Sequence, residues 1–338
     1  SSHDRRMSCR LPRGSVIHRR TVIMRTLASL GGAAALLLCT FISKAVTADA
    51  EALLWNTVSP YISQDARAVM SGDGASLKAS SLMKRFKPKL FDLNRGLARQ
   101  IEETCKLDLE ASAANAVVVT TKDEEPNLYV ETRGLGLNRI KTCIKDLAAR
   151  KGDSAAFSQK GSIIQATVGK SDKVYFGWLN NKILVTSGEL DNRDKLSRAV
   201  SRAKKRFDKR SDVAALLARV DRSATAWGLY VEPSTSTSRD SDKPQRAFGM
   251  LNSKGSQVAG EVHLFFASGE IAAKNAKKLN RELAEAKRDA AKDDKSGPAQ
   301  SRILAAAKIT STENEVVGTA TATQSDAIAV IEPAIEHR

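Results

Sequence analysis

The order of strand-like and helix-like segments most limits what this chain can fold into. Short apolar–polar alternations, typical of half-buried strands, are interleaved with segments whose apolar residues recur every three or four positions, typical of amphipathic helices. A hairpin, a helix, further strands and a closing helix occur in that order twice. This order predicts an α+β fold of two ferredoxin-like or related halves, with helices packed on one face of antiparallel sheet.

The first half is predicted to span residues 51–210 and the second half residues 211–338. In the first half we expect strands at 66–71, 116–120, 128–132, 163–168, 174–178 and 183–186, and helices at 75–91, 93–107, 137–150 and 193–207. In the second half we expect strands at 225–231, 248–252, 258–266 and 316–322, and helices at 213–220, 271–290, 300–307 and 325–334. Two polar stretches, 233–245 and 289–298, are predicted to be flexible loops.

Charge separates the N-terminal segment from the rest of the chain. The 338 residues are 42% hydrophobic and 27% charged, ordinary values for a globular protein, and carry a net charge of +16. Residues 1–50 hold seven Arg and one Lys against two Asp, so the remaining chain carries +10. Such a charge favours contact with polyanions such as lipopolysaccharide, anionic lipid or nucleic acid. The alternative is a soluble surface rich in lysine.

The segment from Met24 to Ala50 has the layout of an export signal. Arg25 provides the positive start, residues 27–42 are uncharged and largely apolar, and small residues precede a cleavage point before Glu51. We therefore expect a signal peptide at 24–50 and an exported protein in the periplasm or the extracellular space. An uncleaved N-terminal membrane anchor at 27–42 is the alternative.

Residues 1–23 are interpreted as a wrongly assigned start or a cloning remnant. Within them, the pair Arg19-Arg20 precedes apolar residues and partly resembles a twin-arginine export motif. The general and the twin-arginine export routes both stay open.

The cysteine count predicts one disulfide. Cys9 and Cys39 precede the predicted cleavage point, which leaves Cys105 and Cys143 as an even pair. In an oxidising compartment such a pair favours a disulfide, and two buried free thiols are the alternative. The sequence has no C-x-x-C motif and no His near these cysteines, so it does not indicate a metal site.

The search for catalytic residues centres on His263. Its strand is expected to point Val262, Leu264 and Phe266 inward, which places His263 on the outer side beside Glu261. The sequence contains no G-x-S-x-G elbow and no H-E-x-x-H motif. We therefore predict no catalytic, cofactor-binding or metal-binding residue, and the sequence favours a protein that is not an enzyme.

Two basic clusters are candidate polyanion-binding sites. Each surrounds a phenylalanine and is expected to end a helix, where cations complement the negative end of the helix dipole. That structural role is one interpretation, and a polyanion-binding patch is the other. The candidates are Lys84, Arg85 and Lys87 in the first cluster, and Lys204, Lys205, Arg206, Lys209 and Arg210 in the second.

Two pairs of segments carry a resemblance to a known group of proteins. Residues 65–73 (DARAVMSGD) with 77–82 (LKASSL), and residues 214–221 (AALLARVD) with 223–227 (SATAW), are similar to segments of uncharacterised exported proteins of the myxobacterial type. The resemblance spans most of residues 51–335, and its motifs are packing patterns. It implies an envelope protein and carries over no functional residue.

Three functional hypotheses follow. The first is a non-enzymatic, exported cell-envelope protein that binds or scaffolds a ligand the sequence does not name. The second is a polyanion-binding module that uses the basic clusters, with an anionic envelope component as its partner. The third is a hydrolase with an unrecognised site, which would require a pocket and a paired carboxylate beside His263.

Overall fold

The computed structural model describes residues 54–73, 97–108, 112–121, 126–187, 190–232, 242–291 and 297–336. The predicted signal peptide at 24–50, the expected helix at 75–91 and the first basic cluster (Lys84, Arg85 and Lys87) lie outside these ranges, as does most of the predicted loop 233–245.

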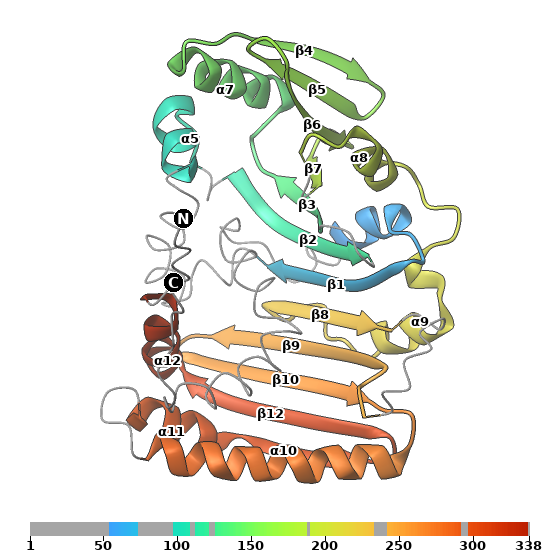
Figure 1. The fold of residues 1–338 in the computed structure, drawn as a ribbon, viewed down its shortest axis with the longest axis vertical. Helices are drawn as coiled ribbons and strands as arrows, with labels where there is room; N and C mark the ends of the chain where they lie inside the picture. The colour runs from blue at the N-terminus through green and yellow to red at the C-terminus, as the bar shows by residue number, and fades with distance from the viewer. Residues whose placement is uncertain are drawn as a thin grey trace, which may run out of the picture.

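The described strands form one continuous, open antiparallel sheet of twelve strands (Figure 1), in the order β11-β12-β10-β9-β8-β1-β2-β3-β7-β6-β5-β4. The strands are β1 (Ala66–Asp73), β2 (Ala113–Thr121), β3 (Asn127–Thr132), β4 (Ala155–Lys160), β5 (Ile163–Val168), β6 (Asp172–Leu179), β7 (Ile183–Ser187), β8 (Ala226–Val231), β9 (Arg246–Lys254), β10 (Gln257–Phe265), β11 (Lys308–Thr312) and β12 (Glu315–Thr323).

Helices flank this sheet. The described structure begins with a helix at residues 54–58, the entry helix, which continues into the 3-10 turn η1 (Ser59–Tyr61). The other helical elements are α5 (Leu97–Cys105), α7 (Leu137–Arg150), α8 (Arg193–Val200), η2 (Phe207–Lys209), α9 (Ser211–Leu217), α10 (Gly269–Ala290), α11 (Gly297–Ala306) and α12 (Gln324–Glu336). No helix in these described ranges is both long and apolar enough to cross a bilayer.

The two parts of the sequence meet where β1 pairs with β8 near the middle of the sheet. In that antiparallel pair Ala68 faces Tyr230 and Gly72 faces Ala226. From this pair the meander β1-β2-β3 runs toward one edge and the meander β8-β9-β10 toward the other. The structure therefore shows a single α+β sheet, and it does not show two ferredoxin-like halves.

One face of the sheet, which we call the α9 face, is covered by residues 54–58, α8 and α9. Its core contains Trp55 and Leu196 from the helices and Val117 and Leu229 from the strands. The phenol of Tyr129 on β3 crosses this core and donates a hydrogen bond to the Ala199 carbonyl oxygen of α8, at 2.9 Å. Burial raises the pKa of Tyr129, with a smaller contribution from Tyr61.

The opposite face, which we call the α10 face, also carries helices. At one end α7 packs on β5 and β6, where Ile140 contacts the cluster around Trp178. At the other end α10 packs through Ala272 and Ala276 against Val316 of β12 (Figure 1).

The expectation that helices pack on one face of the sheet is therefore wrong. The physical reason is visible in β2, where seven consecutive residues from Ala113 to Val119 are buried. A run without polar alternation is typical of a strand covered on both faces.

The predicted disulfide is confirmed. Cys105 at the end of α5 is bonded to Cys143 on α7, with 4.8 Å between the two Cα atoms. Arg139 of α7 reinforces the same junction, because its guanidinium group donates to the backbone carbonyls of Cys105 and Lys106, each at 3.2 Å.

Two strands were not predicted, β4 and β11, and they are the two edges of the sheet. In β4 only Ala155 and Phe157 are even partly buried, and in β11 only Ile309 is. An edge strand exposed to water needs no apolar alternation, so the periodicity that reveals inner strands is absent.

Candidate functional site

The basic residues at 204–210 lie beyond a helix end, not on it. The sequence predicted a helix at 193–207, but α8 ends at Val200 and Ser201 is already extended, with φ −92° and ψ 138°. The Ser201 hydroxyl donates to the Ser197 carbonyl oxygen at 2.7 Å and so helps to close the last turn. The helix dipole acts within the last turn, so it does not explain Lys204 or Lys205.

The backbone of residues 201–210, which we call the basic segment, is hydrogen-bonded to residues 60–64, near the start of the described structure. The Ala203 amide donates to the Pro60 carbonyl oxygen at 2.9 Å, and the Gln64 amide donates to that of Lys205 at 2.9 Å. The Phe207 amide donates to the Ile62 carbonyl oxygen at 3.0 Å, and the Phe207 ring is fully buried. The basic segment is therefore anchored at three points and by one core side chain.

Arg206 is engaged within the protein. It forms a two-pronged ion pair with Asp208, with N···O distances of 2.9 and 2.6 Å, and donates to the Ser59 hydroxyl oxygen at 3.2 Å. In this fork geometry the guanidinium group donates two hydrogen bonds to one carboxylate. Arg206 thus acts as a structural link between the basic segment and η1.

Arg210 forms the same kind of two-pronged ion pair, with Asp212 two residues later in the sequence. Its N···O distances to that carboxylate are 3.1 and 2.7 Å, and it donates to the Gln64 carbonyl oxygen at 3.0 Å. Partial burial raises the pKa of Asp212, but the hydrogen bond and charge of Arg210 outweigh that effect and leave the pKa below its usual value. Arg210 is therefore also structural.

The remaining three cations form what we call the lysine trio: Lys204, Lys205 and Lys209. All three side chains are exposed. None forms a hydrogen bond or ion pair with any residue in the described ranges. The second predicted cluster therefore divides into two arginines paired within the protein and three lysines whose side chains are exposed and unpaired within the described residues.

A second basic surface, on α10, was missed by the sequence analysis. Its four members are exposed, and residues 271–281 contain no acidic residue. Spacings of three and four residues place them on neighbouring turns of the helix face turned away from the sheet. The four are Lys274, Lys277, Lys278 and Arg281, of which Lys274 is paired with Asp242 at 2.8 Å. The acid-free interval was the signal that could have revealed this surface.

His263 lies in the core of the α9 face, not on the outer side. Its exposed fraction is 7%, and its ring stacks on Phe248 of β9 with centroids 4.1 Å apart and planes at 14°. The predicted alternation along β10 is correct, and Leu264 and Phe266 pack on the α10 face as expected, although Val262 is 37% exposed. The face that carries His263 is covered as well, so the histidine is buried. On this face, residues just after α9 cover β10. The sequence pattern does not predict this long-range contact.

Both ring nitrogens of His263 face carboxylates. Nδ1 contacts Glu315 Oε1 at the start of β12, and Nε2 contacts Glu261 Oε1 on the same strand as the histidine. Arg219, two residues after α9, forms a two-pronged ion pair with Glu315 at 3.0 and 2.8 Å. We call these four residues the histidine cluster.

The histidine cluster is closed on its inner side by aromatic rings. The Arg219 guanidinium carbon lies 5.2 Å from the ring centroids of both Phe248 and Phe265. Partial burial raises the pKa of Glu315, but hydrogen bonds from Arg219 and His263 outweigh it, so the pKa of this carboxyl lies below its usual range. Glu315 therefore stays ionised to lower pH than an ordinary glutamate.

The geometry of the histidine cluster suits neither a metal nor a nucleophile. Glu261 and Glu315 contact opposite nitrogens of one ring, so the three groups do not converge on a point where an ion could sit. Over the described part of the chain, no three His, Cys, Asp or Glu side chains form a metal-holding group. The hydrolase hypothesis thus gains the carboxylate that it required, but within the described residues the ring nitrogens of His263 contact only Glu261, Glu315 and Arg219.

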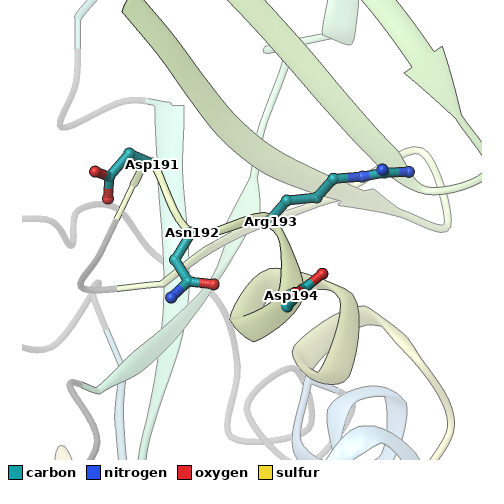
Figure 2. Close-up of a pocket in the computed structure, with 4 residues that line it drawn as sticks. All are labelled: Asp191, Asn192, Arg193 and Asp194. Atoms are coloured by element: carbon teal, nitrogen blue, oxygen red, sulfur yellow. The ribbon is translucent and has the colours of Figure 1, made fainter.

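A surface depression lies elsewhere, at the start of α8, lined by Asp191 to Asp194. Figure 2 shows that Asp191 and Arg193 point in different directions from this turn. Asn192 is engaged as the helix cap, because its side chain accepts a hydrogen bond from the Lys195 amide at 3.1 Å. These side chains do not converge on a shared ligand.

No protein-family model matches the sequence, and the comparison with curated proteins finds no significant match. The fold is distantly similar to that of TP0453. Crystal form III of that protein gives a TM-score of 0.45 at 9% identity, with 81% of this chain and 96% of that chain covered. Crystal form I gives 0.43 at 10% identity, with 82% and 97% covered, and form IV gives 0.43 at 9% identity, with 81% and 95% covered.

Proposed function

We propose that this protein is exported to the cell envelope, is not an enzyme, and binds an anionic envelope component through the lysine trio. The observation that carries the proposal is the state of Lys204, Lys205 and Lys209. Their ammonium groups are exposed and unpaired within the described residues, while the backbone that bears them is fixed. A fixed backbone lowers the entropy lost when these side chains bind an anion.

Sequence features support export. The layout from Met24 to Ala50 is that of a signal peptide, and the disulfide between Cys105 and Cys143 suits an oxidising compartment. The resemblance of residues 65–73 with 77–82, and of 214–221 with 223–227, to uncharacterised exported proteins of the myxobacterial type points the same way. N-terminal sequencing of the protein recovered from the periplasm or medium is expected to begin at Glu51. A chain that stays in the cytoplasm with residues 24–50 attached would contradict export.

The chemistry of the lysine trio favours phosphate or sulfate groups on a polymer or surface, such as lipopolysaccharide. Three lysines can neutralise about three such groups and release their counterions. The logarithm of the binding constant should then fall by roughly two to three for each tenfold rise in salt. The +10 charge outside residues 1–50 adds a weaker, non-specific attraction.

Immobilised heparin, eluted with a salt gradient, tests this proposal. We expect the variant Lys204→Gln/Lys205→Gln/Lys209→Gln to elute at clearly lower salt than the wild-type protein. The comparison variant is Lys277→Gln/Lys278→Gln/Arg281→Gln, which removes the same charge from α10, and its loss of retention should be clearly smaller than that of the lysine trio variant. Equal losses of retention in the two triple variants would mean that net charge alone governs binding, and the proposal would then be wrong.

A further inference from the structure

The balance of charge in the histidine cluster depends on one proton. Glu261 and Glu315 each bring one negative charge, and Arg219 brings one positive charge. With an imidazolium at His263 the four residues are neutral as a group, and with a neutral imidazole they carry one uncompensated negative charge. That charge would fall on Glu261, because Glu315 is paired with Arg219, and Glu261 is 41% exposed, so the charge balance favours the imidazolium only modestly.

The hydrogen bonds point to the same protonation state. A neutral imidazole has one N–H donor and one lone pair, so it can satisfy only one of the two carboxylates. Arg219 Nη2 also lies 3.3 Å from His263 Nδ1, but both atoms face the same oxygen, Glu315 Oε1. If Nδ1 accepted from Arg219, its lone pair would lie against that carboxylate oxygen. Only the imidazolium donates on both sides.

The histidine cluster fastens the end of α9 to the sheet. Arg219 belongs to the turn that closes α9, where its amide donates to the Leu216 carbonyl oxygen at 2.9 Å. The inner side of α9 is held by Val213 and Leu216, whereas its outer end is tied to β12 by the ion pair between Arg219 and Glu315. Because His263 holds Glu315 in place, it controls that tie.

We propose that His263 is a proton-dependent clamp, whose imidazolium form binds Glu261 and Glu315 together and thereby holds the end of α9 on β10 and β12. Loss of the proton leaves a lone pair facing one carboxylate and releases that contact. The clamp is closed when His263 carries both protons and opens when one of them is lost. The proposal does not depend on anion binding by the lysine trio.

One further charged group lies near the clamp. Arg246 on β9 places its guanidinium carbon 5.4 Å from the Phe265 ring centroid. Within the described residues it forms no ion pair with Glu261 or Glu315, so it does not replace the proton on His263. The groups facing the imidazole are therefore Glu261, Glu315 and Arg219.

Nitrogen NMR of the histidine side chains tests the charge state directly. In the native protein labelled with 15N-histidine, both ring nitrogens of His263 should carry a proton at pH 7, with the signals assigned by their absence from His263→Gln. An unmodified histidine is mostly neutral at that pH. A single protonated nitrogen on His263 at pH 7 in the folded protein would overturn the proposal. The charge state is read in the wild type, and His263→Gln serves only for assignment.

Hydrogen exchange tests what the clamp holds. The protection factors of the amides at residues 213–220, corrected for intrinsic exchange, should fall at least about tenfold in the wild type between pH 5.5 and pH 8, as expected for loss of a hydrogen bond between charged groups. The variant Glu261→Gln removes one of the two carboxylates, so its fall should be smaller. Amides of β5 and β6 serve as the control. Equal protection of residues 213–220 at both pH values in the wild type would refute the clamp.

Discussion

Trp55 packs edge-on against Trp227, with ring centroids 5.4 Å apart and ring planes at 79°. This contact joins the entry helix at residues 54–58 to β8, which lies beside β1 at the centre of the sheet. Both rings are buried, and edge-on aromatic pairs contribute beyond the area that they bury. The entry helix therefore belongs to the main core.

Replacement of Trp55 by alanine should lower the free energy of unfolding by about 3–5 kcal/mol, because the large ring leaves a cavity in the core. Urea denaturation followed by far-UV circular dichroism measures this loss. The control is Leu190→Ala, since Leu190 is 47% exposed and its truncation should cost less than about 0.5 kcal/mol. Equal effects of the two substitutions would show that Trp55 is not a core residue.

The disulfide between Cys105 and Cys143 closes a loop with a sequence separation of 38 residues. Restricting the unfolded chain in this way is expected to stabilise the protein by about 2–4 kcal/mol. Dithiothreitol should therefore shift the urea unfolding midpoint of the wild type downward. It should leave the midpoint of Cys105→Ser/Cys143→Ser unchanged, and an equal shift in both proteins would exclude the disulfide as its cause.

Local patterns predicted the inner elements of this fold well. The helix expected at 137–150 matches α7, and the short gap between the strands expected at 174–178 and 183–186 contains Asn180 and Asn181, with φ values of 50° and 57° in the structure. Such elements are specified by nearby residues, through apolar periodicity and through side chains that tolerate positive φ. The pairing of β1 with β8 is set by contacts distant in sequence, and no local pattern reveals it.

The candidate site was predicted only in part for the same reason. Composition identified the second basic cluster. It could not show that Arg206 and Arg210 form ion pairs with Asp208 and Asp212, while the side chains of the lysine trio stay unpaired within the described residues. For His263 the alternation of β10 was clear, yet the burial of its ring depends on contacts with Arg219 and Glu315, which are distant in sequence. Both distinctions arise from tertiary contacts.

Two strand glycines should respond oppositely to an added methyl group. A Cβ atom on Gly177 of β6 would overlap Val200 Cγ1 and lie 3.0 Å from Val185 Cβ, whereas one on Gly318 of β12 would meet nothing within 4 Å. Gly177→Ala should therefore lose about 1–3 kcal/mol of stability through overpacking. Gly318→Ala should be neutral or gain up to about 1 kcal/mol, because alanine loses less backbone entropy on folding. A thermal melt of each variant beside the wild type measures both effects, and a more destabilised Gly318→Ala would contradict the packing of these strands.

The ion pair between Arg210 and Asp212 should make stability depend on acid pH. The pKa of Asp212 is lower in the folded protein than its usual value, so the stabilisation is present above the unfolded pKa and is lost as the pH falls through the folded pKa. Asp212→Asn should cost about 1 kcal/mol at pH 7, a modest value because the pair is partly exposed to solvent. That cost should shrink as the pH is lowered from 5 toward 3, where the wild-type carboxylate also takes up a proton. Urea unfolding of both proteins across this range gives the difference directly, and a cost that is the same at pH 3 as at pH 7 would mean that the charge of Asp212 contributes nothing.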